Sequence, residues 1–396
     1  MILTARKSTY LFILLLTCCH LVSCAQDVPI STTIQTGADR TGLYLKQLKG
    51  KRIAIVANQT SVISTGIGHT HLVDSLLSLK MNVKKVFAPE HGFRGKADAG
   101  ELVKDGIDTK TGLPIISLYG KNKKPSKEQL KGIDVVVFDI QDVGARFYTY
   151  ISSLHYVMEA SAEARIPVII LDRPNPNGHY IDGPVLEPEH KSFVGMHPVP
   201  VVYGMTIGEY GKMINGEKWL EKGIQTKLTV IPLKNYTHQS EYHLPIKPSP
   251  NLPNDTSINL YPSLCFFEGT NVNAGRGTDN QFQVYGSPFL NRKSTFSYTP
   301  TPNEGAKFPK HAYMISYGED LRKTPKLSGL NLSWLIKAKG ENRTKTFFND
   351  FFTKLAGTTK LQSQLEGQVS EEDIKLSWKD GLEVFKKVRS KYLLYK

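Results

Sequence analysis

A carboxyl side chain at Glu90 stands where it could act as a general acid. It follows an apolar run and lies between Pro89, which restricts the approach of the chain, and His91-Gly92, where glycine permits a sharp turn. A carboxyl group in such a place can be partly desolvated, which raises its pKa and suits proton donation. A helix cap or a structural ion pair is the alternative, because structural carboxylates are also often perturbed.

A second polar cluster lies around Asp139 and Asp142, with Gln141 between them and Arg146 and Tyr148 beyond. Carboxylates and amides at this density suit the recognition of sugar hydroxyls. An arginine beside them could pair bidentately with a carboxylate on a substrate. An Asp–Arg ion pair that only holds the loop is the alternative.

A third group lies in the second half of the chain, where Glu268, Asn271 and Arg276 stand among glycines. If this glycine-rich loop faces the first cluster, Glu268 could complete a carboxylate pair with Glu90. The glycines could equally serve only as turn residues. The sequence leaves both possibilities open.

The elements that must position these groups alternate regularly between residues 38 and 238. We expect strands at 52–57, 83–88, 113–118, 134–139, 166–171 and 228–233, and helices at 72–79, 147–164 and 206–215. Continuous Val/Ile runs separated by helices indicate a parallel sheet that is covered on both faces. The predicted fold class is therefore α/β, with a Rossmann-like, doubly wound parallel sheet.

Polar residues follow four of these strands, at 58–60, 89–92, 139–142 and 172–175, the last including Asp172, Arg173 and Asn175. In open α/β sheets, ligands bind outside the carboxyl ends of the strands. A single cluster could be helix capping, but four clusters at one edge predict one site. From residue 239 onward, prolines and aromatic stripes at helical spacing predict a smaller α+β domain over 239–396 that completes the cleft.

Several kinds of chemistry lack their sequence signals. No strand is followed by Gly-x-Gly-x-x-Gly, and the nucleoside triphosphate motif is absent, so we expect no cofactor. His69 and His71 form only an i, i+2 pair, and no His-Glu-x-x-His or cysteine cluster exists, so we expect no metal. Gly-x-Ser-x-Gly is absent as well, which argues against a serine hydrolase. Cys265 lies in an apolar stretch and is expected to be a buried, inert thiol.

The first residues predict export. Arg6 and Lys7 precede an apolar run that is too short to span a bilayer, and the segment ends in Leu-Val-Ser before Cys24. Residues 1–23 are thus predicted to be a lipoprotein signal peptide, because this ending resembles the bacterial lipobox. Cys24 would then carry the lipid anchor, and residues 24–37 would be a tether. The protein is accordingly expected in the cell envelope, as a membrane-anchored lipoprotein that faces the periplasm.

The formal charge of +14 falls to +12 when Arg6 and Lys7 leave with the signal. A basic chain could bind nucleic acid, but no basic run exceeds a few residues and aromatic residues are not interleaved. We therefore expect no nucleic-acid partner. Anionic cell-wall polymer or a membrane surface fits an envelope protein better, and a solvated basic surface is the simpler alternative.

The motifs as a set resemble those of a bacterial family, the exo-β-N-acetylmuramidases, formerly catalogued as a domain of unknown function. The matching segments are 89–95, 117–120, 138–150, 171–176, 268–271 and 275–278. They occur in order over nearly the whole mature chain, and the segment 138–150 is highly specific. The resemblance implies a Rossmann-like domain over 38–238, an auxiliary domain over 239–396 and an active cleft between them.

The resemblance also implies an activity: release of N-acetylmuramic acid from the non-reducing ends of peptidoglycan fragments (muropeptides). The family's catalytic glutamate maps to Glu90, while Asp139, Glu268 or the acetamido group of the substrate could supply the second catalytic group. We expect the substrate to contact His91, Gln141, Asp142, Arg146, Tyr148, Asp172, Arg173, Asn175, Asn271 and Arg276.

The lactyl carboxylate of N-acetylmuramic acid calls for an arginine. We rank Arg146 first because it follows the Asp139 cluster at the predicted edge, then Arg173, then Arg276. Two rival functions would use the same cleft: a non-catalytic lipoprotein that binds muropeptides, and a hydrolase of another bond such as an amide.

Overall fold

Seven strands form the central sheet of the computed structural model, which describes residues 33–94 and 105–395. In spatial order they are β5 (Gly106–Ile107), β6 (Pro114–Ser117), β4 (Val83–Ala88), β1 (Ile53–Ala57), β7 (Val135–Asp139), β8 (Val168–Leu171) and β9 (Leu228–Ile231). All neighbours run parallel except the edge pair β5 and β6. Without β5 this is the strand order of the Rossmann fold. The predicted α/β class is confirmed.

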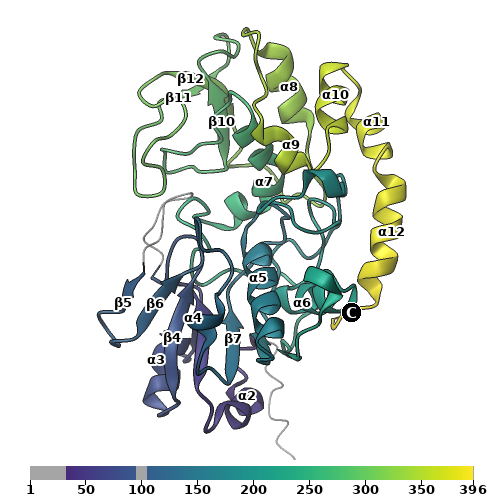
Figure 1. The fold of residues 1–396 in the computed structure, drawn as a ribbon. Coiled ribbons are helices and arrows are strands. Elements are labelled where there is room, and N and C mark those ends of the chain that lie inside the picture. The colour runs from purple at the N-terminus through teal and green to yellow at the C-terminus, as the bar shows by residue number, and fades with distance from the viewer. Residues whose placement is uncertain (1–32, 95–104, 396) are drawn as a thin grey trace, which may run out of the picture. The chain divides into compact units, whose positions relative to one another are not determined.

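Both faces of the sheet are buried, as the unbroken apolar runs predict. Alternate residues of β1 enter different cores: Ala54 and Val56 pack with residues of α5 (Tyr150–Glu163) and α6 (Ile207–Gly216). Ile53 and Ile55 pack with residues of α2 (Thr41–Leu48) and α3 (Leu72–Ser78). Figure 1 shows α5 and α6 side by side along the sheet. The remaining elements of this half are the hairpin β2 (Val62–Ser64) and β3 (His69–His71) and the short helices α4 (Lys127–Leu130), η1 (Pro188–His190) and η2 (Glu221–Gly223).

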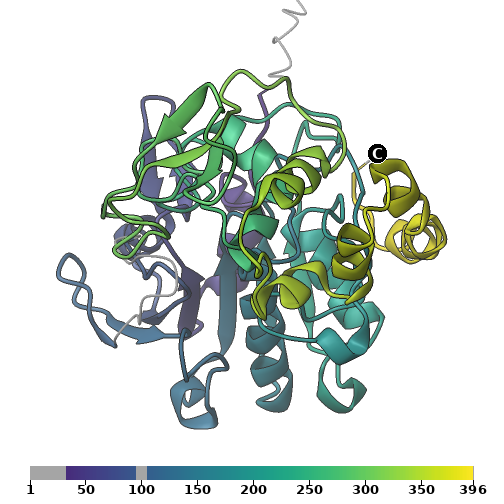
Figure 2. The same ribbon diagram turned by 90° about the horizontal axis from the view of Figure 1, so that it is seen from above.

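The C-terminal part lies over the upper end of the sheet (Figures 1 and 2). It begins with α7 (Asp255–Leu264) and η3 (Cys265–Gly269) and contains an antiparallel sheet of β10 (Val284–Ser287), β12 (Ser316–Asp320) and β11 (Phe296–Tyr298). Its later helices are α8 (Ser333–Glu341), α9 (Phe351–Ala356), α10 (Lys360–Glu366), α11 (Glu371–Leu376) and α12 (Lys379–Ser390). The predicted smaller part with both helices and strands is therefore present.

One apolar core continues from the sheet into the C-terminal part. The ring of Phe147, from the loop after β7, lies 5.4 Å from that of Tyr261 and 5.9 Å from that of Phe266. Residues 34–396 accordingly form one compact unit. The predicted boundary between residues 238 and 239 stays a prediction.

The end of the chain returns to the sheet after α12. The hydroxyl of Tyr395 donates to the Asp172 carboxylate at 2.6 Å and accepts from the backbone N–H of Leu233 at 2.8 Å. The backbone N–H of Leu394 donates to Glu209 at 2.7 Å. The last residues thereby close a buried polar site at the end of β8.

The predicted signal at residues 1–23 and the lipidation site at Cys24 lie outside the described residues. The predicted tether extends to residue 37, but its last residues belong to the folded unit: Gln35 pairs with Lys234, and the backbone N–H of Gly37 donates to the backbone carbonyl of Asp172 at 2.7 Å. The fold therefore begins earlier than the polar composition indicates. Within 33–94 and 105–395, no helix has the length and apolar character needed to cross a membrane.

Candidate active site

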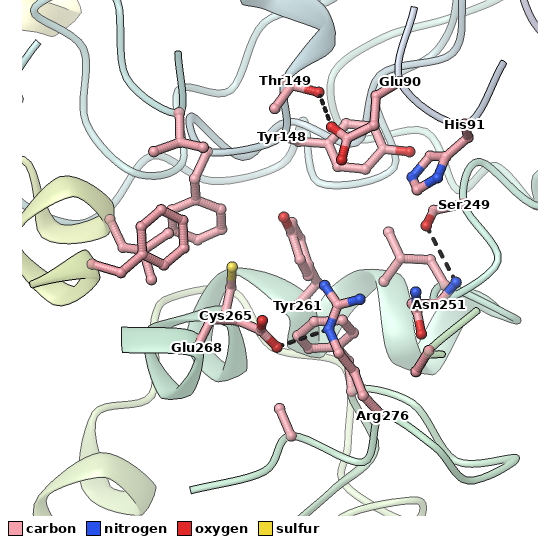
Figure 3. Close-up of a pocket in the computed structure, with 18 of the residues that line it drawn as sticks. Glu90, His91, Tyr148, Thr149, Ser249, Asn251, Tyr261, Cys265, Glu268 and Arg276 are labelled. Carbon is pink, nitrogen blue, oxygen red and sulfur yellow. Dashed lines mark hydrogen bonds and ion pairs between the residues drawn. The ribbon is translucent and has the colours of Figure 1, made fainter. Parts of the chain in front are cut away.

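A cavity of about 530 Å³ lies between the strand ends of the sheet and the C-terminal part (Figure 3). Five of the predicted site residues line it: Glu90, His91, Tyr148, Glu268 and Arg276. The first three come from loops after β4 and β7, and the other two come from η3 and the glycine-rich loop that follows it. The structure thus brings together two segments that are about half the chain apart.

The loop after β4 places the Glu90 side chain at the cavity. Pro89 accepts a hydrogen bond of 3.0 Å from the backbone N–H of Gly92, which closes a tight turn. The turn needs two successive left-handed residues, with φ of +68° at His91 and +76° at Gly92. Glycine adopts this conformation freely, whereas a histidine there is uncommon and marks a locally constrained backbone. The turn fixes the direction in which Glu90 leaves the strand.

The hydroxyl group of Thr149 holds the Glu90 carboxyl group. The Thr149 hydroxyl, just before α5, donates to Oε2 of Glu90 at 2.7 Å (Figure 3). Burial and the nearby Glu90 charge raise the pKa of Tyr119, whose side chain lines the same cavity. Glu90 itself is half-buried and lines the cavity. A carboxyl group held in this way can present a proton to a bound glycosidic oxygen.

The facing wall carries an ion pair. Nε of Arg276 donates to Oε1 of Glu268 at 2.8 Å, and the two side chains are 22% and 26% exposed. The Glu268 charge raises the pKa of Arg276 against the opposing effect of burial. Because Arg276 donates to Glu268 through Nε, the remaining N–H groups of its guanidinium can serve an anionic ligand. Figure 3 shows this pair across the cavity from Glu90.

Lys310 is a further cation of the cavity lining, but its ammonium group is already committed. It donates to the carbonyl oxygens of Phe267 and Val272, each at 3.0 Å, and to that of Thr270. Burial lowers the pKa of Lys310. All three donors of the ammonium group are thereby used, so it ties the segment around residue 310 to η3.

Aromatic side chains form the deeper walls of the cavity. Tyr148 meets Tyr150 edge-to-face at 4.9 Å between ring centroids and Tyr261 at 5.9 Å. The Tyr148 hydroxyl donates to the Pro248 carbonyl at 2.8 Å. Apolar rings with anchored hydroxyls, combined with a few charged groups, are the usual lining of a small-molecule site.

The Asp139 cluster does not reach the cavity lining. Asp139 is fully buried and accepts from Nε and Nη2 of Arg173 at 2.6 and 2.9 Å. Burial raises the pKa of Asp139, and the Arg173 guanidinium opposes that rise. Because β7 and β8 are neighbours, the residues at their ends meet and pair with each other. The structure therefore gives Asp139 and Arg173 a mutual structural contact and no contact with the cavity.

Arg146, ranked first for the lactyl carboxylate, lies away from the cavity. It is fully buried, and its guanidinium donates to four carbonyl oxygens, those of Pro184, Val199, Leu355 and Ala356. Within the described part of the chain it has no ion-pair partner, and burial lowers its pKa to about 9. This position does not support the predicted role, because the side chain joins backbone segments from both halves of the chain.

Gln141 and Asp142 are also buried outside the cavity lining. The amide nitrogen of Gln141 donates to the carbonyl oxygens of Asp142 and Pro174 at 2.7 and 2.6 Å. Asp142 accepts from the backbone N–H of Gly144 at 2.8 Å and from the hydroxyl of Tyr203. Burial raises the pKa of Asp142 to about 6. Both side chains thus shape the loop after β7.

Asp172, Asn175 and Asn271 do not line the cavity either. Asp172 accepts from the backbone N–H of Gly208 at 2.7 Å and from Tyr395, and burial raises its pKa to about 7. The amide nitrogen of Asn175 donates to the Met205 carbonyl at 2.8 Å. That of Asn271 donates to side chains and a carbonyl in residues 342–346. Each of these side chains joins two segments of the backbone.

Sequence reasoning missed several cavity residues. Tyr119 and Thr149 lie inside matched motifs, so their position in those motifs was an available signal. Lys310, Phe193 and Phe308 also line the cavity, but they stand in segments without periodicity or a motif.

Metal-like groupings lie elsewhere. In the described residues, the closely spaced sets of acidic and histidine side chains are Glu187, Glu189 and His190, and Glu159, Glu163 and Glu221. Neither set lines the cavity. In the second set, the Lys124 ammonium lies 2.8 Å from both Glu159 and Glu163 and already supplies a positive charge.

A Rossmann-like sheet whose strand ends carry this cavity, with carboxyl groups on facing walls, an arginine and aromatic sides, fits a hydrolase that acts on a sugar. Two family models match the sequence: "Exo-beta-N-acetylmuramidase NamZ, N-terminal" over residues 53–256 and "Exo-beta-N-acetylmuramidase NamZ, C-terminal" over 259–395. The chain is 40% identical over 391 aligned residues to the peptidoglycan beta-N-acetylmuramidase NamZ of Bacillus subtilis (strain 168), with 91% of each covered. The chain belongs to the exo-β-N-acetylmuramidase NamZ family.

Two solved structures are similar to this fold. Both are DUF1343 family proteins of Bacteroides fragilis NCTC 9343, with TM-scores of 0.85 and 0.78 and sequence identities of 46% and 27%. Each match covers 92% of this chain and 99% of the other. The two family models meet between residues 256 and 259, at the start of α7.

Proposed function

We propose that this protein is an exo-acting glycoside hydrolase that releases N-acetylmuramic acid from the non-reducing end of peptidoglycan fragments. The observation that carries the proposal is the Glu90 carboxyl group, held by Thr149 in a cavity of a chain that is 40% identical to a peptidoglycan beta-N-acetylmuramidase. If Glu90 catalyses hydrolysis, the protein is an enzyme and not a lipoprotein that only binds muropeptides.

In this mechanism Glu90 donates a proton to the oxygen that leaves with the next sugar. Asp139 drops out as the second catalytic group because Arg173 occupies both of its oxygens. Two candidates from the sequence remain: Glu268, on the facing wall, and the acetamido group of the substrate. In the first case, Glu268 would act as the nucleophile or base, with its Oε1 positioned by the hydrogen bond from Nε of Arg276.

Arg276 is the arginine that supports recognition of the lactyl carboxylate. The guanidinium groups of Arg146 and Arg173 donate hydrogen bonds to buried acceptors, whereas the Arg276 side chain is 22% exposed at the cavity wall. A planar guanidinium with free N–H groups matches a carboxylate bidentately. Arg276, which ranks third from the sequence, is therefore the first candidate to bind the lactyl carboxylate.

Export and anchoring complete the proposal. The basic residues, short apolar run and Leu-Val-Ser-Cys ending of residues 1–24 support a signal that is removed before Cys24. Acyl chains on that cysteine would hold the enzyme at a membrane of the cell envelope, facing the periplasm, where peptidoglycan fragments arise.

A direct assay tests the activity. Purified protein should release the chromophore from a chromogenic β-N-acetylmuramide, with N-acetylmuramic acid identified by mass spectrometry, while the matched β-N-acetylglucosaminide should react far more slowly. Tight binding of the muramide without any release would instead favour the binding lipoprotein. Release of a peptide from a muropeptide with the sugar bond intact would favour the hydrolase of another bond.

A further inference from the structure

Exposure of the aromatic rings differs sharply between the depth and the mouth of the cavity. Phe147, Tyr148, Tyr150, Tyr261 and Phe282 line it and are buried. Phe308 lines the same cavity and is 94% exposed. Exposure alone is common for single apolar side chains, but this ring also lines the cavity, so it is available for contact with a bound ligand.

The backbone around Phe308 is firmly held although its ring is exposed. The adjacent Lys310 ammonium donates to three carbonyl oxygens at η3 and the loop after it. Pro309 packs so closely on Gly277 that a Cβ there would lie 2.6 Å from the proline ring. The backbone N–H of Thr301 donates to the Gly277 carbonyl at 2.9 Å. The segment that carries the ring is therefore held at the mouth, so a contact with ligand needs to order only the Phe308 side chain.

We propose that the Phe308 ring is the platform on which the leaving-group sugar packs. The inference rests on the proposed function, in which the sugar released beside N-acetylmuramic acid is a neutral N-acetylhexosamine. The sugar ring of an N-acetylhexosamine has an apolar C–H face, and an exposed aromatic side chain offers a matching flat surface. Lys310 spends its three donors on backbone carbonyl oxygens, so Glu90 and the Glu268–Arg276 pair are the charged groups assigned to the inner sugar, and Phe308 is assigned to the outer sugar.

Steady-state kinetics on two substrates with the same inner sugar test this assignment. One is the disaccharide of N-acetylmuramic acid β-linked to N-acetylglucosamine, and the other is methyl β-N-acetylmuramide, which has no leaving-group ring. Phe308→Ala should lower kcat/KM on the disaccharide about fivefold or more beyond its effect on the methyl glycoside, which is the order expected for one lost aromatic contact. Phe308→Tyr should restore most of that loss, because it keeps the ring.

Tyr313→Ala is the matched control, since Tyr313 is 73% exposed five residues further on and does not line the cavity. It should leave both substrates unchanged. Equal effects of Phe308→Ala on the two substrates would overturn the proposal, and so would a loss that appears only when the substrate carries a stem peptide. Failure of the function itself would look different: wild type would then hydrolyse neither substrate.

Discussion

The hydroxyl of Thr149 donates a 2.7 Å hydrogen bond to Oε2 of Glu90 and so joins the loop after β4 to the start of α5. The two residues are 59 positions apart in sequence, and both line the cavity. A carboxyl group whose rotamer is fixed before substrate arrives loses little entropy when it transfers a proton. Glu90 is therefore the residue whose chemistry should matter most.

Glu90→Gln should lower kcat on a chromogenic β-N-acetylmuramide at least about 100-fold, because an amide cannot donate the proton that general acid catalysis needs. The melting temperature should stay the same, since the side chain keeps its shape and can still accept from Thr149. Glu128→Gln is the control, because Glu128 is 83% exposed on α4. Activity of the Glu90 variant within a few-fold of wild type would remove Glu90 from the acid role.

Arg276→Lys should narrow the preference for muramides over glucosaminides. Lysine keeps the charge but loses the planar fork, so the lactyl carboxylate would lose its bidentate partner. We expect kcat/KM on the muramide to fall about tenfold or more while the glucosaminide changes little. Arg322→Lys, at an exposed pair with Asp320, should change neither substrate. An equal loss on both substrates would show that Arg276 only supports Glu268.

Arg146→Met should destabilise the fold without changing substrate preference. The substitution leaves four buried carbonyl oxygens without their donor, which we expect to cost at least about 3 kcal/mol of unfolding free energy in urea titrations. The ratio of activities on muramide and glucosaminide should be the same in the folded variant as in wild type. A stable variant with an altered ratio would return Arg146 to the substrate site.

Asp142→Asn should change how stability depends on pH. Burial raises the pKa of Asp142 from 3.8 to about 6, so the folded protein binds this proton more tightly than the unfolded chain. The stabilisation that the fold gains from this tighter proton binding is complete below about pH 4, and it is lost as the pH rises through about 6. Relative to the variant, wild type should lose about 2 kcal/mol of unfolding free energy between pH 4.5 and pH 7.5.

The control for this titration is Asp320→Asn. The Arg322 guanidinium lowers the pKa of Asp320, so its contribution is already nearly complete at pH 4.5. The difference between wild type and this control should stay nearly flat over the same range. A flat difference for Asp142→Asn as well would mean that the Asp142 carboxyl group stays ionised in the fold.

Cys24→Ala should abolish membrane anchoring. Without the sulfur that accepts the lipid, the chain should be misprocessed or released, because one cysteine would carry all of the acyl chains. Detergent phase partitioning measures this directly: wild type should enter the detergent phase and the variant should not. Wild-type protein found wholly in the aqueous phase would contradict the lipoprotein proposal.

The sheet could be predicted from sequence because its strands are unbroken apolar runs. The expected strand at 83–88 matches β4, and the expected helix at 206–215 differs from α6 by one residue at each end. Burial on both faces imposes this pattern, so it is visible without knowledge of the partners. The expected strand at 113–118, by contrast, is one residue longer than β6 at each end. There the pairing with neighbouring strands, and not the apolar character of the residues, sets the limits of the strand.

The site was harder to predict because polar residues at strand ends can pair with one another. Asp139 and Arg173 looked like ligand groups, but the adjacency of β7 and β8 makes them partners. Only the three-dimensional neighbours tell whether a charge is already compensated. Lys310 and Phe308 reach the cavity through an irregular segment, and no periodicity in the sequence marks such residues.

The contact of Tyr395 with Asp172 has a consequence for the order of events during synthesis. The buried carboxyl group of Asp172 and the backbone N–H of Leu233 obtain this partner from Tyr395, which lies 223 positions beyond Asp172 in the sequence. Domains commonly fold from the N-terminus as the ribosome extends the chain. Here the buried hydrogen bonds at the end of β8 cannot all form until Tyr395 has been synthesised, so the sheet is completed only after the C-terminal part has been made.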